Sequence, residues 1–300
     1  MGIEELRQYA ANILRDGRVK LLIGYGEGGD GRVVPMFITA TEIERCSQLI
    51  YDQRCTYNLS VYLLKAEIKS LWSGAVNLSG KVALVAKVET VRSALGLIAE
   101  NQIKKEDLCL LGVRGVGAVA AAGAVGTEGD WSSISSYCER VFDVGEDVGG
   151  DIGEKNSHRL PEKLDQEIDA LLKKSPEERL HFWRQHFASC IRCYACRQIC
   201  PHCFCSTCIV EKSMPQWVSP VSSESGNFSW NIIRAYHLVG RCVGCGECAR
   251  ACPMGLRLDL LNRYMVKMVQ EKYSFKAGLS AEDKPPLTTY HLNDNQDFIK

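Results

Sequence analysis

Three short apolar runs in the first part of the chain predict buried strands. Residues 19–25 (VKLLIGY), 81–87 (KVALVAK) and 108–113 (LCLLGV) have the β-branched, apolar composition of strands that are covered on both faces. Between the last two runs, apolar residues repeat at helical spacing, at Val91, Ala94, Leu95 and Ile98. A strand, a helix and a strand in this order predict a right-handed βαβ unit. We therefore expect an amino-terminal α/β domain.

The pattern becomes helical in the second half of the chain. One predicted helix face consists of Leu164, Ile168, Leu171 and Leu172. Ser175, Pro176 and Glu178 then supply an N-cap, a first-turn proline and a capping-box acid, which predict a helix that leads to Cys190. Further helices are expected over residues 230–239 and from Leu261 to Met268. This half is therefore expected to be mainly α-helical.

Residues 144–162 (VGEDVGGDIGEKNSHRLPE) separate the two halves. This segment is rich in glycine and acidic residues and has neither the period of a strand nor that of a helix, which is typical of a linker. The expected organisation is an α/β domain over residues 1–145, a linker over 146–160, a helical domain over 161–275 and a carboxy-terminal tail over 276–300.

Composition and charge exclude several classes of partner. Lys plus Arg equals Asp plus Glu, at 36 each, and no basic stripe is visible, so we do not expect nucleic acid to bind. The sequence contains no apolar run of about 18 residues and no export signal after Met1, so we expect a cytoplasmic protein without a membrane span. Because thiols stay reduced in that compartment, the fifteen cysteines are interpreted as metal ligands or buried thiols.

Two glycine-rich stretches raise the question of a nucleotide site. Residues 24–29 (GYGEGG) match a dinucleotide-binding pattern, but Pro35 and β-branched residues follow where a helix is required, so we interpret the stretch as a surface turn. The second stretch, residues 112–126, leaves the carboxyl end of a buried strand, where α/β sheets bind ligands. A flavin or anion there would contact Gly112, Gly115 and Gly117, and close packing of small residues is the alternative.

Eleven of the fifteen cysteines lie between Cys190 and Cys252, and eight of these form two copies of C-x2-C-x2-C-x3-C-P. A zinc ion would leave the central cysteine of each triplet without a role, whereas a 4Fe–4S cluster takes three thiolates from such a triplet and a fourth from elsewhere. In two-cluster ferredoxins the cysteine before the proline ligates the other cluster. The expected ligands are therefore Cys190, Cys193, Cys196 and Cys252 for cluster 1, and Cys242, Cys245, Cys248 and Cys200 for cluster 2.

Three more cysteines, Cys203, Cys205 and Cys208, follow the first motif directly. Free thiols this close together would oxidise easily, which favours a third 4Fe–4S cluster. Its fourth ligand stays open among Cys55, Cys138, His202 and Glu89. The alternative is that the three thiols surround cluster 1 without ligating it.

Two resemblances to known families give these motifs a context. Residues 241–256 (RCVGCGECARACPMGL) resemble the α-helical dicluster ferredoxin modules of respiratory and heterodisulfide-reductase-type subunits, and residues 200–205 (CPHCFC) resemble dicluster subunits of cytoplasmic hydrogenases and anaerobic sulfite reductase. Residues 81–117 resemble the core of the beta-subunit family of deazaflavin-coenzyme-reducing hydrogenases and formate dehydrogenases. Many members carry a cysteine near the strand end that residues 87–90 occupy here, and another beside the glycines of residues 112–115. This chain has Glu89 and Arg114 in these places, so any cofactor that depends on those cysteines is in question.

The resemblance implies an iron–sulfur electron-transfer subunit of an anaerobic oxidoreductase complex, whose partners are other redox subunits of hydrogenase, formate dehydrogenase or heterodisulfide-reductase type. The alternative is a subunit that itself holds FAD and exchanges hydride or electrons with a soluble carrier. The sequence favours the electron-transfer subunit without FAD, because its six histidines are dispersed and no acid, base or nucleophile constellation stands out.

Overall fold

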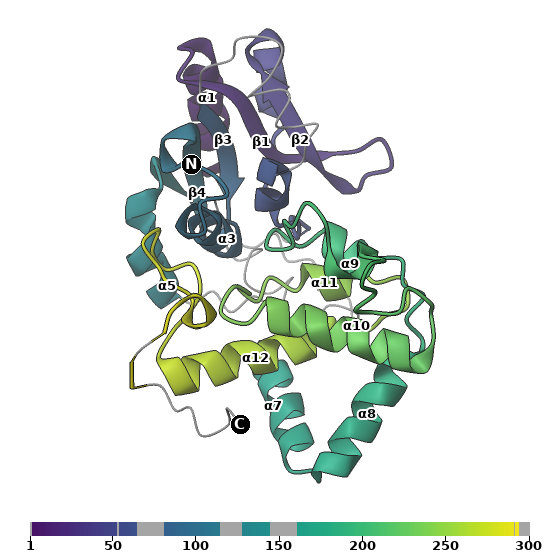
Figure 1. The fold of residues 1–300 in the computed structure, drawn as a ribbon. Helices are drawn as coiled ribbons and strands as arrows, with labels where there is room; N and C mark the ends of the chain where they lie inside the picture. Colours follow the sequence, from purple (N-terminus) through teal and green to yellow (C-terminus); the bar gives the residue numbers. More distant parts are fainter. Residues whose placement is uncertain are drawn as a thin grey trace.

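The computed structural model describes residues 2–52, 54–64, 81–114, 128–144, 161–290 and 292–293. An α/β domain with a five-stranded sheet is followed by a mainly helical domain, as the sequence predicts (Figure 1). The expected linker, residues 146–160, lies outside the described residues.

The sheet is mixed and has the strand order β2-β1-β3-β4-β5. Its strands are β1 (Val19–Glu27), β2 (Val33–Thr39), β3 (Lys81–Ala86), β4 (Leu108–Arg114) and β5 (Arg140–Asp143). β2 runs antiparallel to β1, and all other neighbours are parallel. The three predicted strands are confirmed as β1, β3 and β4. They form the centre of the sheet and are almost fully buried.

The first glycine-rich stretch is mostly strand. Gly24 and Gly26 lie within β1, and the turn begins only at Gly28, whose backbone N–H donates to the Arg32 carbonyl at 2.8 Å. The expected surface turn is therefore confined to the last part of the stretch. β2 follows in place of the helix that a dinucleotide site needs, and it carries Pro35 on the edge of the sheet, where a missing N–H is tolerated.

Short helices surround the sheet. The α-helices of this domain are α1 (Gly2–Arg15), α3 (Val88–Ala99) and α5 (Glu128–Ile134), and its 3-10 helices are η1 (Ala40–Gln48), η2 (Leu59–Leu64), η3 (Lys105–Asp107) and η4 (Ser135–Tyr137). α3 is the predicted crossover helix between β3 and β4. All of its residues from Val88 to Leu95 are buried, polar ones included. Because α3 is covered on all sides, other parts of the chain pack against it in addition to the sheet.

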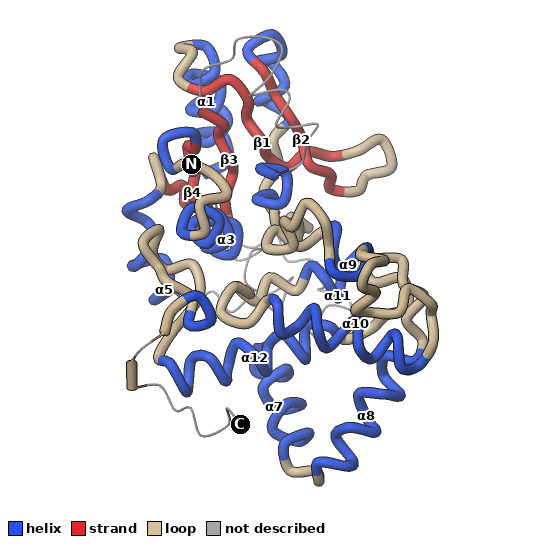
Figure 2. The backbone as a smooth tube through the Cα atoms, in the orientation of Figure 1, coloured by secondary structure: helices blue, strands red, loops and turns tan. Residues whose placement is uncertain are grey.

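The helical domain contains both cysteine motifs and lies next to the α/β domain (Figures 1 and 2). Its helices are α7 (Pro161–Leu172), α8 (Pro176–Ala188), α9 (Ala195–Gln198), η5 (Ile209–Glu211), α10 (Glu224–His237), α11 (Glu247–Arg250), α12 (Leu258–Tyr273) and η6 (Pro286–Thr288). Loops, drawn in tan in Figure 2, make up much of the chain between α8 and α10. Among the described helices, each is too short or too polar to serve as a transmembrane span.

Capping residues set the starts of two of these helices. The predicted capping box is confirmed: the Glu178 backbone N–H donates to Ser175 Oγ at 3.2 Å, and the Ser175 N–H donates to Glu178 Oε2 at 2.7 Å. α10 begins at Glu224, earlier than the apolar pattern indicates, because Ser223 caps it by accepting from the Gly226 N–H. The polar first turn of α10 has no apolar periodicity that could reveal it.

A strap formed by residues 274–283 joins the two domains beyond α12. Arg92 of α3 donates to the Ala277 carbonyl at 2.8 and 3.0 Å, and Lys276 lies 2.5 Å from Asp130 of α5. Tyr137 donates to Glu282 at 2.9 Å. The strap, yellow in Figure 1, therefore runs beside α5 and covers α3.

Candidate metal centre

The two cysteine motifs share one backbone conformation. In each motif the residues directly before and after the second cysteine have positive φ: Arg192 and Tyr194 (58° and 59°), and Gly244 and Gly246 (76° and 72°). This left-handed region is rare for residues other than glycine. In the first motif side chains stabilise it, because Arg192 donates to two backbone carbonyls at 2.6 and 2.8 Å and Tyr194 packs edge-on against a buried tryptophan.

A one-turn helix follows each of these loops and carries the third cysteine. Cys196 lies on α9 and Cys248 on α11, and the two helices contact each other. The two motifs are therefore in contact, although more than thirty residues separate them in the sequence.

The second motif encloses a small cavity of about 30 Å³ together with a cysteine of the first motif. Four cysteines line it: Cys200, Cys242, Cys245 and Cys248. They are the four expected ligands of cluster 2, and the cysteine before the proline reaches across from the first motif. The buried guanidinium of Arg234 and the side chain of Asn262 also line this cavity.

The first motif gathers around Cys196. Burial raises the pKa of the Cys196 thiol, Arg234 lowers it, and the neighbouring thiols of Cys203, Cys190 and Cys252 raise it further. Cys190, Cys196 and Cys252 also pack in the same apolar cluster. The structure thus brings Cys252 to the first motif, and Cys193 lies exposed at the surface.

The donor set fits a 4Fe–4S cluster. Within the described residues, no three His, Cys, Asp or Glu side chains converge as they would around one metal ion. The cysteines of the second motif line a cavity instead, as thiolates do when each binds a different iron. Burial raises the pKa of Cys245 to about 12, so iron would have to displace a proton from this thiol.

Polar side chains support both cysteine groups. Asn262 of α12 donates to Cys248 Sγ at 3.3 Å, and Arg234 of α10 donates to the Cys196 carbonyl at 3.0 Å. Asn58 comes from the α/β domain, and its hydrogen bond acts to lower the pKa of the Cys245 thiol. Sequence reasoning missed these three residues. Arg234 lies in a helix that was predicted from its packing pattern alone. The sequence did offer one signal for its role, namely an arginine among the buried positions of that helix.

The three further cysteines are only partly brought together. Cys203 and Cys205 line a cavity of about 350 Å³ that also contacts Val61 and Leu64 of the α/β domain. Cys208 precedes η5, and its backbone N–H donates to Glu211 at 2.8 Å. A hydrogen bond between the thiols of Cys203 and Cys200 lowers the pKa of Cys203, so Cys203 directly contacts an expected ligand of cluster 2.

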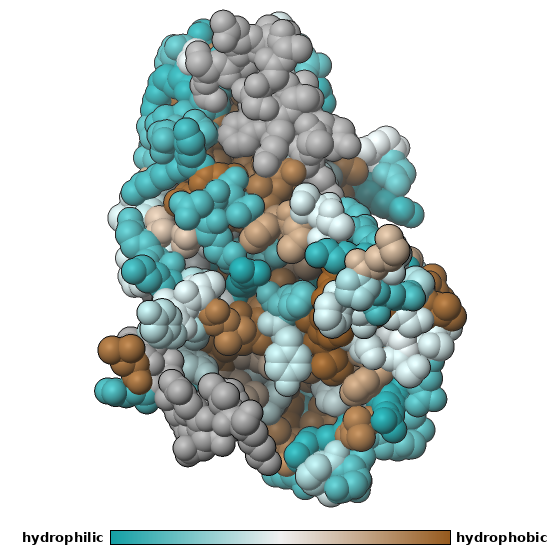
Figure 3. Space-filling view, in the orientation of Figure 1, coloured by the Kyte–Doolittle hydropathy of each residue, from teal (hydrophilic) through white to brown (hydrophobic). Residues whose placement is uncertain are grey.

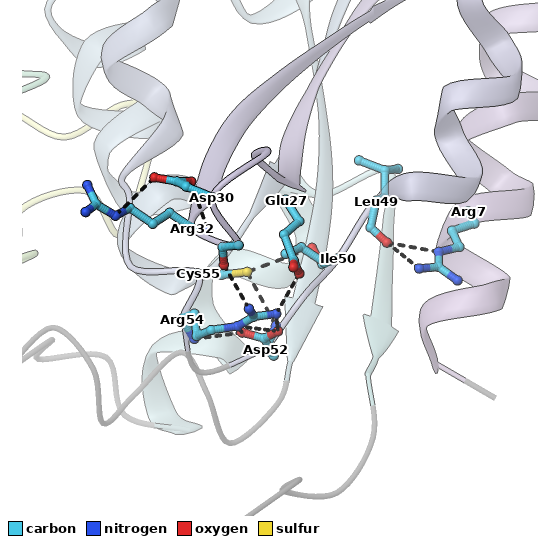
Figure 4. A network of polar contacts seen from close by, with 10 residues as sticks. Arg7, Glu27, Asp30, Arg32, Leu49, Ile50, Asp52, Arg54 and Cys55 are labelled. Atoms are coloured by element: carbon cyan, nitrogen blue, oxygen red, sulfur yellow. Dashed lines mark hydrogen bonds and ion pairs between the residues drawn. The ribbon is translucent and has the colours of Figure 1, made fainter. Parts of the chain in front are cut away.

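The four candidates for a fourth ligand of a third cluster lie elsewhere. Cys55 Sγ accepts from the Asp52 N–H at 3.4 Å and lies 3.8 Å from the Ile50 carbonyl (Figure 4). Cys138 packs near Gly112, and His202 packs against α3 at Gly96. Glu89 is buried in α3. Among the described residues that line the Cys203 cavity, none of these four appears.

Gly112 has a packing role. A Cβ at Gly112 would lie 3.0 Å from Cys138 Sγ and 3.1 Å from the Trp131 ring, so the glycine allows α5 and the following segment to approach β4. Gly115 and Gly117 lie outside the described residues.

The carboxyl end of β3, which the sequence indicates as one place for a flavin, holds a buried polar group around Lys87. Lys87 Nζ donates to the carbonyls of Cys55 and Thr56, at 3.3 and 2.5 Å. Beside it, Glu89 Oε2 and Thr90 Oγ1 are buried without a hydrogen-bond partner among the described residues. Burial raises the pKa of Glu89, and the charge of Lys87 acts in the opposite direction. Unpaired buried oxygens at a strand end are typical of a ligand site.

Two comparisons with known proteins agree with this geometry. A 4Fe-4S binding domain matches residues 236–256, which include the whole second motif. The chain is also 28% identical over 180 residues to the F420-dependent formate dehydrogenase subunit beta of Methanocaldococcus jannaschii. The match covers 56% of this chain and 47% of that protein, so the chain spans about half the length of this relative. The chain is thus a distant homologue of this formate dehydrogenase beta subunit and carries a 4Fe–4S binding segment.

Proposed function

We propose that the protein is an iron–sulfur electron-transfer subunit of an anaerobic, cytoplasmic oxidoreductase complex of hydrogenase, formate dehydrogenase or heterodisulfide-reductase type. The observation that carries the proposal is the cavity in which Cys200 of the first motif joins Cys242, Cys245 and Cys248 of the second. Such crossed sets occur where two 4Fe–4S clusters lie close enough to exchange electrons. The homologue is a subunit of a dehydrogenase, which supports other redox subunits as partners.

The proposed ligands divide into the two sets that the spacing predicts. Cluster 1 would use Cys190, Cys193, Cys196 and Cys252, and cluster 2 would use Cys242, Cys245, Cys248 and Cys200. When bound, the clusters accept and release single electrons. The chain supplies thiolates, a buried apolar surrounding and the hydrogen bond from Asn262 to Cys248. Exposed Cys193 makes cluster 1 the one that faces a partner.

Metal analysis and a set of cysteine variants test this proposal. Protein purified without oxygen should contain at least eight irons and eight sulfides per chain, because two 4Fe–4S clusters require them. Cys252→Ala should disturb the same spectroscopic signal as Cys190→Ala, and Cys200→Ala the same signal as Cys242→Ala. Cys46→Ala is the control, since this cysteine is buried in the core of the α/β domain. Zinc as the main metal, or Cys252→Ala pairing with Cys242→Ala, contradicts the proposal.

The unpaired oxygens of Glu89 and Thr90 favour one alternative function, in which the α/β domain binds FAD and the subunit exchanges hydride or electrons with a soluble carrier. The relative is named as F420-dependent. Flavin released in one-to-one ratio from the isolated chain would establish this alternative. We expect no bound flavin, because the sequence favours an electron-transfer subunit without FAD.

A further inference from the structure

We propose that Arg234 is a single positive charge shared by both clusters, and that it raises the reduction potential of each. This inference rests on the proposed function, since it requires that two clusters are present. It assigns to one side chain of α10 an effect that no cysteine ligand provides.

The position of Arg234 supports a shared role. Its side chain is 4% exposed and lies in α10, which packs against both α8 and α12. One end of the guanidinium donates to the carbonyl of Cys196 in the first motif. The same side chain lines the cavity formed by Cys200, Cys242, Cys245 and Cys248. Arg234 therefore contacts the surroundings of both proposed clusters.

The charge of Arg234 has no carboxylate among its strongest partners. The groups that act on it most strongly are cysteine thiols of both motifs: Cys203, Cys248, Cys200 and Cys196. Arg234 Nε has no hydrogen-bond partner among the described residues. A buried charge without a counter-ion is costly, which points to an anionic neighbour.

Arg263 provides the contrast. It lines the same cavity, but it forms a two-point ion pair with Asp165, with both N–O distances at 2.9 Å. Its charge is therefore largely compensated by a carboxylate of α7. Of the two arginines that line the cavity, Arg234 is the one whose positive charge interacts mainly with the cysteines.

The expected effect follows from electrostatics. Reduction of a 4Fe–4S cluster adds one electron and so one negative charge, which a nearby fixed cation stabilises. Inside a protein the interaction decays slowly, because little water screens it. A cation between two clusters therefore favours the reduced form of both. Asn262, in contrast, donates to Cys248 and to no other group among the described residues, so it should affect cluster 2 alone.

The test is a redox titration of the intact, iron-loaded protein, with dithionite as the electron donor and the two cluster signals followed by EPR. Arg234→Met should make reduction of both clusters at least tenfold less favourable, which corresponds to about 59 mV for a one-electron couple. Arg234→Lys should shift both potentials less. Asn262→Leu should shift the signal of cluster 2 only.

The matched control is the double variant Arg263→Gln with Asp165→Asn. It removes a neutral ion pair whose arginine lines the same cavity, and it should leave both potentials close to those of the parent. If Arg234→Met does not load eight irons, Arg234→Gln is measured in its place, since glutamine still donates to a carbonyl but carries no charge. Full loading with unchanged potentials, or a shift of one cluster only, overturns the inference. Failure of both variants to load iron also overturns it and assigns Arg234 a purely structural role.

Failure of the inference is distinguishable from failure of the proposed function. A parent protein without eight irons and two signals contradicts the proposed function itself. A parent protein with both clusters, combined with unaltered potentials in the Arg234 variants, contradicts only the role of Arg234.

Discussion

Gly96 in α3 is a residue at which the α/β domain closely approaches a side chain of the helical domain. A Cβ at this position would lie 2.8 Å from Cε1 of His202, which follows directly after the first motif. The His202 ring is buried, and neither of its nitrogens has a hydrogen-bond partner among the described residues. Burial lowers the pKa of His202 to about 4, so the ring is neutral at neutral pH and packs as an apolar group.

Gly96→Ala should therefore lower the free energy of unfolding by about 1–3 kcal/mol, the usual cost of overpacking a filled site. Thermal unfolding of the iron-loaded protein, or chemical unfolding where it is reversible, would measure this change. Gly29→Ala is a matched control, because a Cβ there meets nothing within 4 Å. Adding His202→Ala to Gly96→Ala should recover part of the loss. A loss of the same size in both glycine variants would contradict this account of the interface.

A second prediction at this scale concerns Glu89. Burial raises its pKa in the folded protein, so folding is favoured when the carboxyl is protonated and is penalised as the pH rises above the pKa of the unfolded chain, about 4.3. Glu89→Gln removes this penalty. The melting temperature of the variant should exceed that of the parent by a margin that grows from pH 5 to pH 8. Exposed Glu44→Gln is the control, and an equal margin at both pH values would show that Glu89 is not penalised.

Among the elements, those with a strong internal pattern were predictable. β1, β3, β4 and α3 follow from apolar runs and helical spacing, and α8 follows from its capping box. The antiparallel strand β2 was not predicted, because its pairing with β1 depends on tertiary contact and its sequence contains a proline. β5 has four residues, too few to show a period. The helix α1 was also not predicted, although it buries Leu6, Ala10, Ile13 and Leu14 on one face.

The loop between α9 and α10 gives a prediction at the element scale. If its thiols bind a third cluster, the protein should contain near twelve irons, and a Cys203→Ser, Cys205→Ser double variant should contain about eight with both ferredoxin-type signals intact. The hydrogen bond between the thiols of Cys203 and Cys200 supports a role in which Cys203 ligates no cluster, but it places Cys203 beside a proposed ligand of cluster 2 rather than around cluster 1, where the sequence placed it. In that case the parent protein contains eight irons, and the double variant shifts the cluster 2 signal without loss of iron. Iron and sulfide analysis of both proteins under strict exclusion of oxygen decides between them.

At the scale of the whole molecule, the sequence indicates the candidate metal ligands more directly than it indicates their surroundings. Ligand spacing is a local property, so the two C-x2-C-x2-C-x3-C-P motifs could be read directly. Arg234, Asn262 and Asn58 reach the cysteines from three separate segments, and only the folded chain brings them together. The proximity of Cys252 to the first motif was predicted by analogy with two-cluster ferredoxins, and the neighbours of Cys196 agree with it.

The two domains have separate cores, which leads to a prediction about iron removal. The apolar core of the α/β domain surrounds the sheet, whereas that of the helical domain includes Cys196 and Cys248. Apolar surface is also visible where the two domains meet in Figure 3. Removing iron with a chelator under mild oxidation should unfold the helical domain before the α/β domain, because metal binding is coupled to the folding of the helical domain.

Hydrogen exchange measured by mass spectrometry would test this order. Protection should fall in α10 and α12 while β1, β3 and β4 keep theirs. The protein before iron removal is the reference, and a chain with Cys46→Ala, treated in the same way, controls for oxidation of a buried thiol in the α/β domain. Equal loss of protection in the sheet and in the helices would show that the two cores depend on each other.

The strap over α3 has a consequence for biogenesis. Residues 274–283 leave the ribosome after every cysteine of both motifs, and an amino-terminal α/β domain can fold before they appear. Until then Arg92 lacks the carbonyl of Ala277 and Asp130 lacks Lys276. The contact between the domains is therefore completed only in chains that already contain all their cysteines. A nascent chain that stops within the second motif therefore lacks the strap contacts to Arg92 and Asp130.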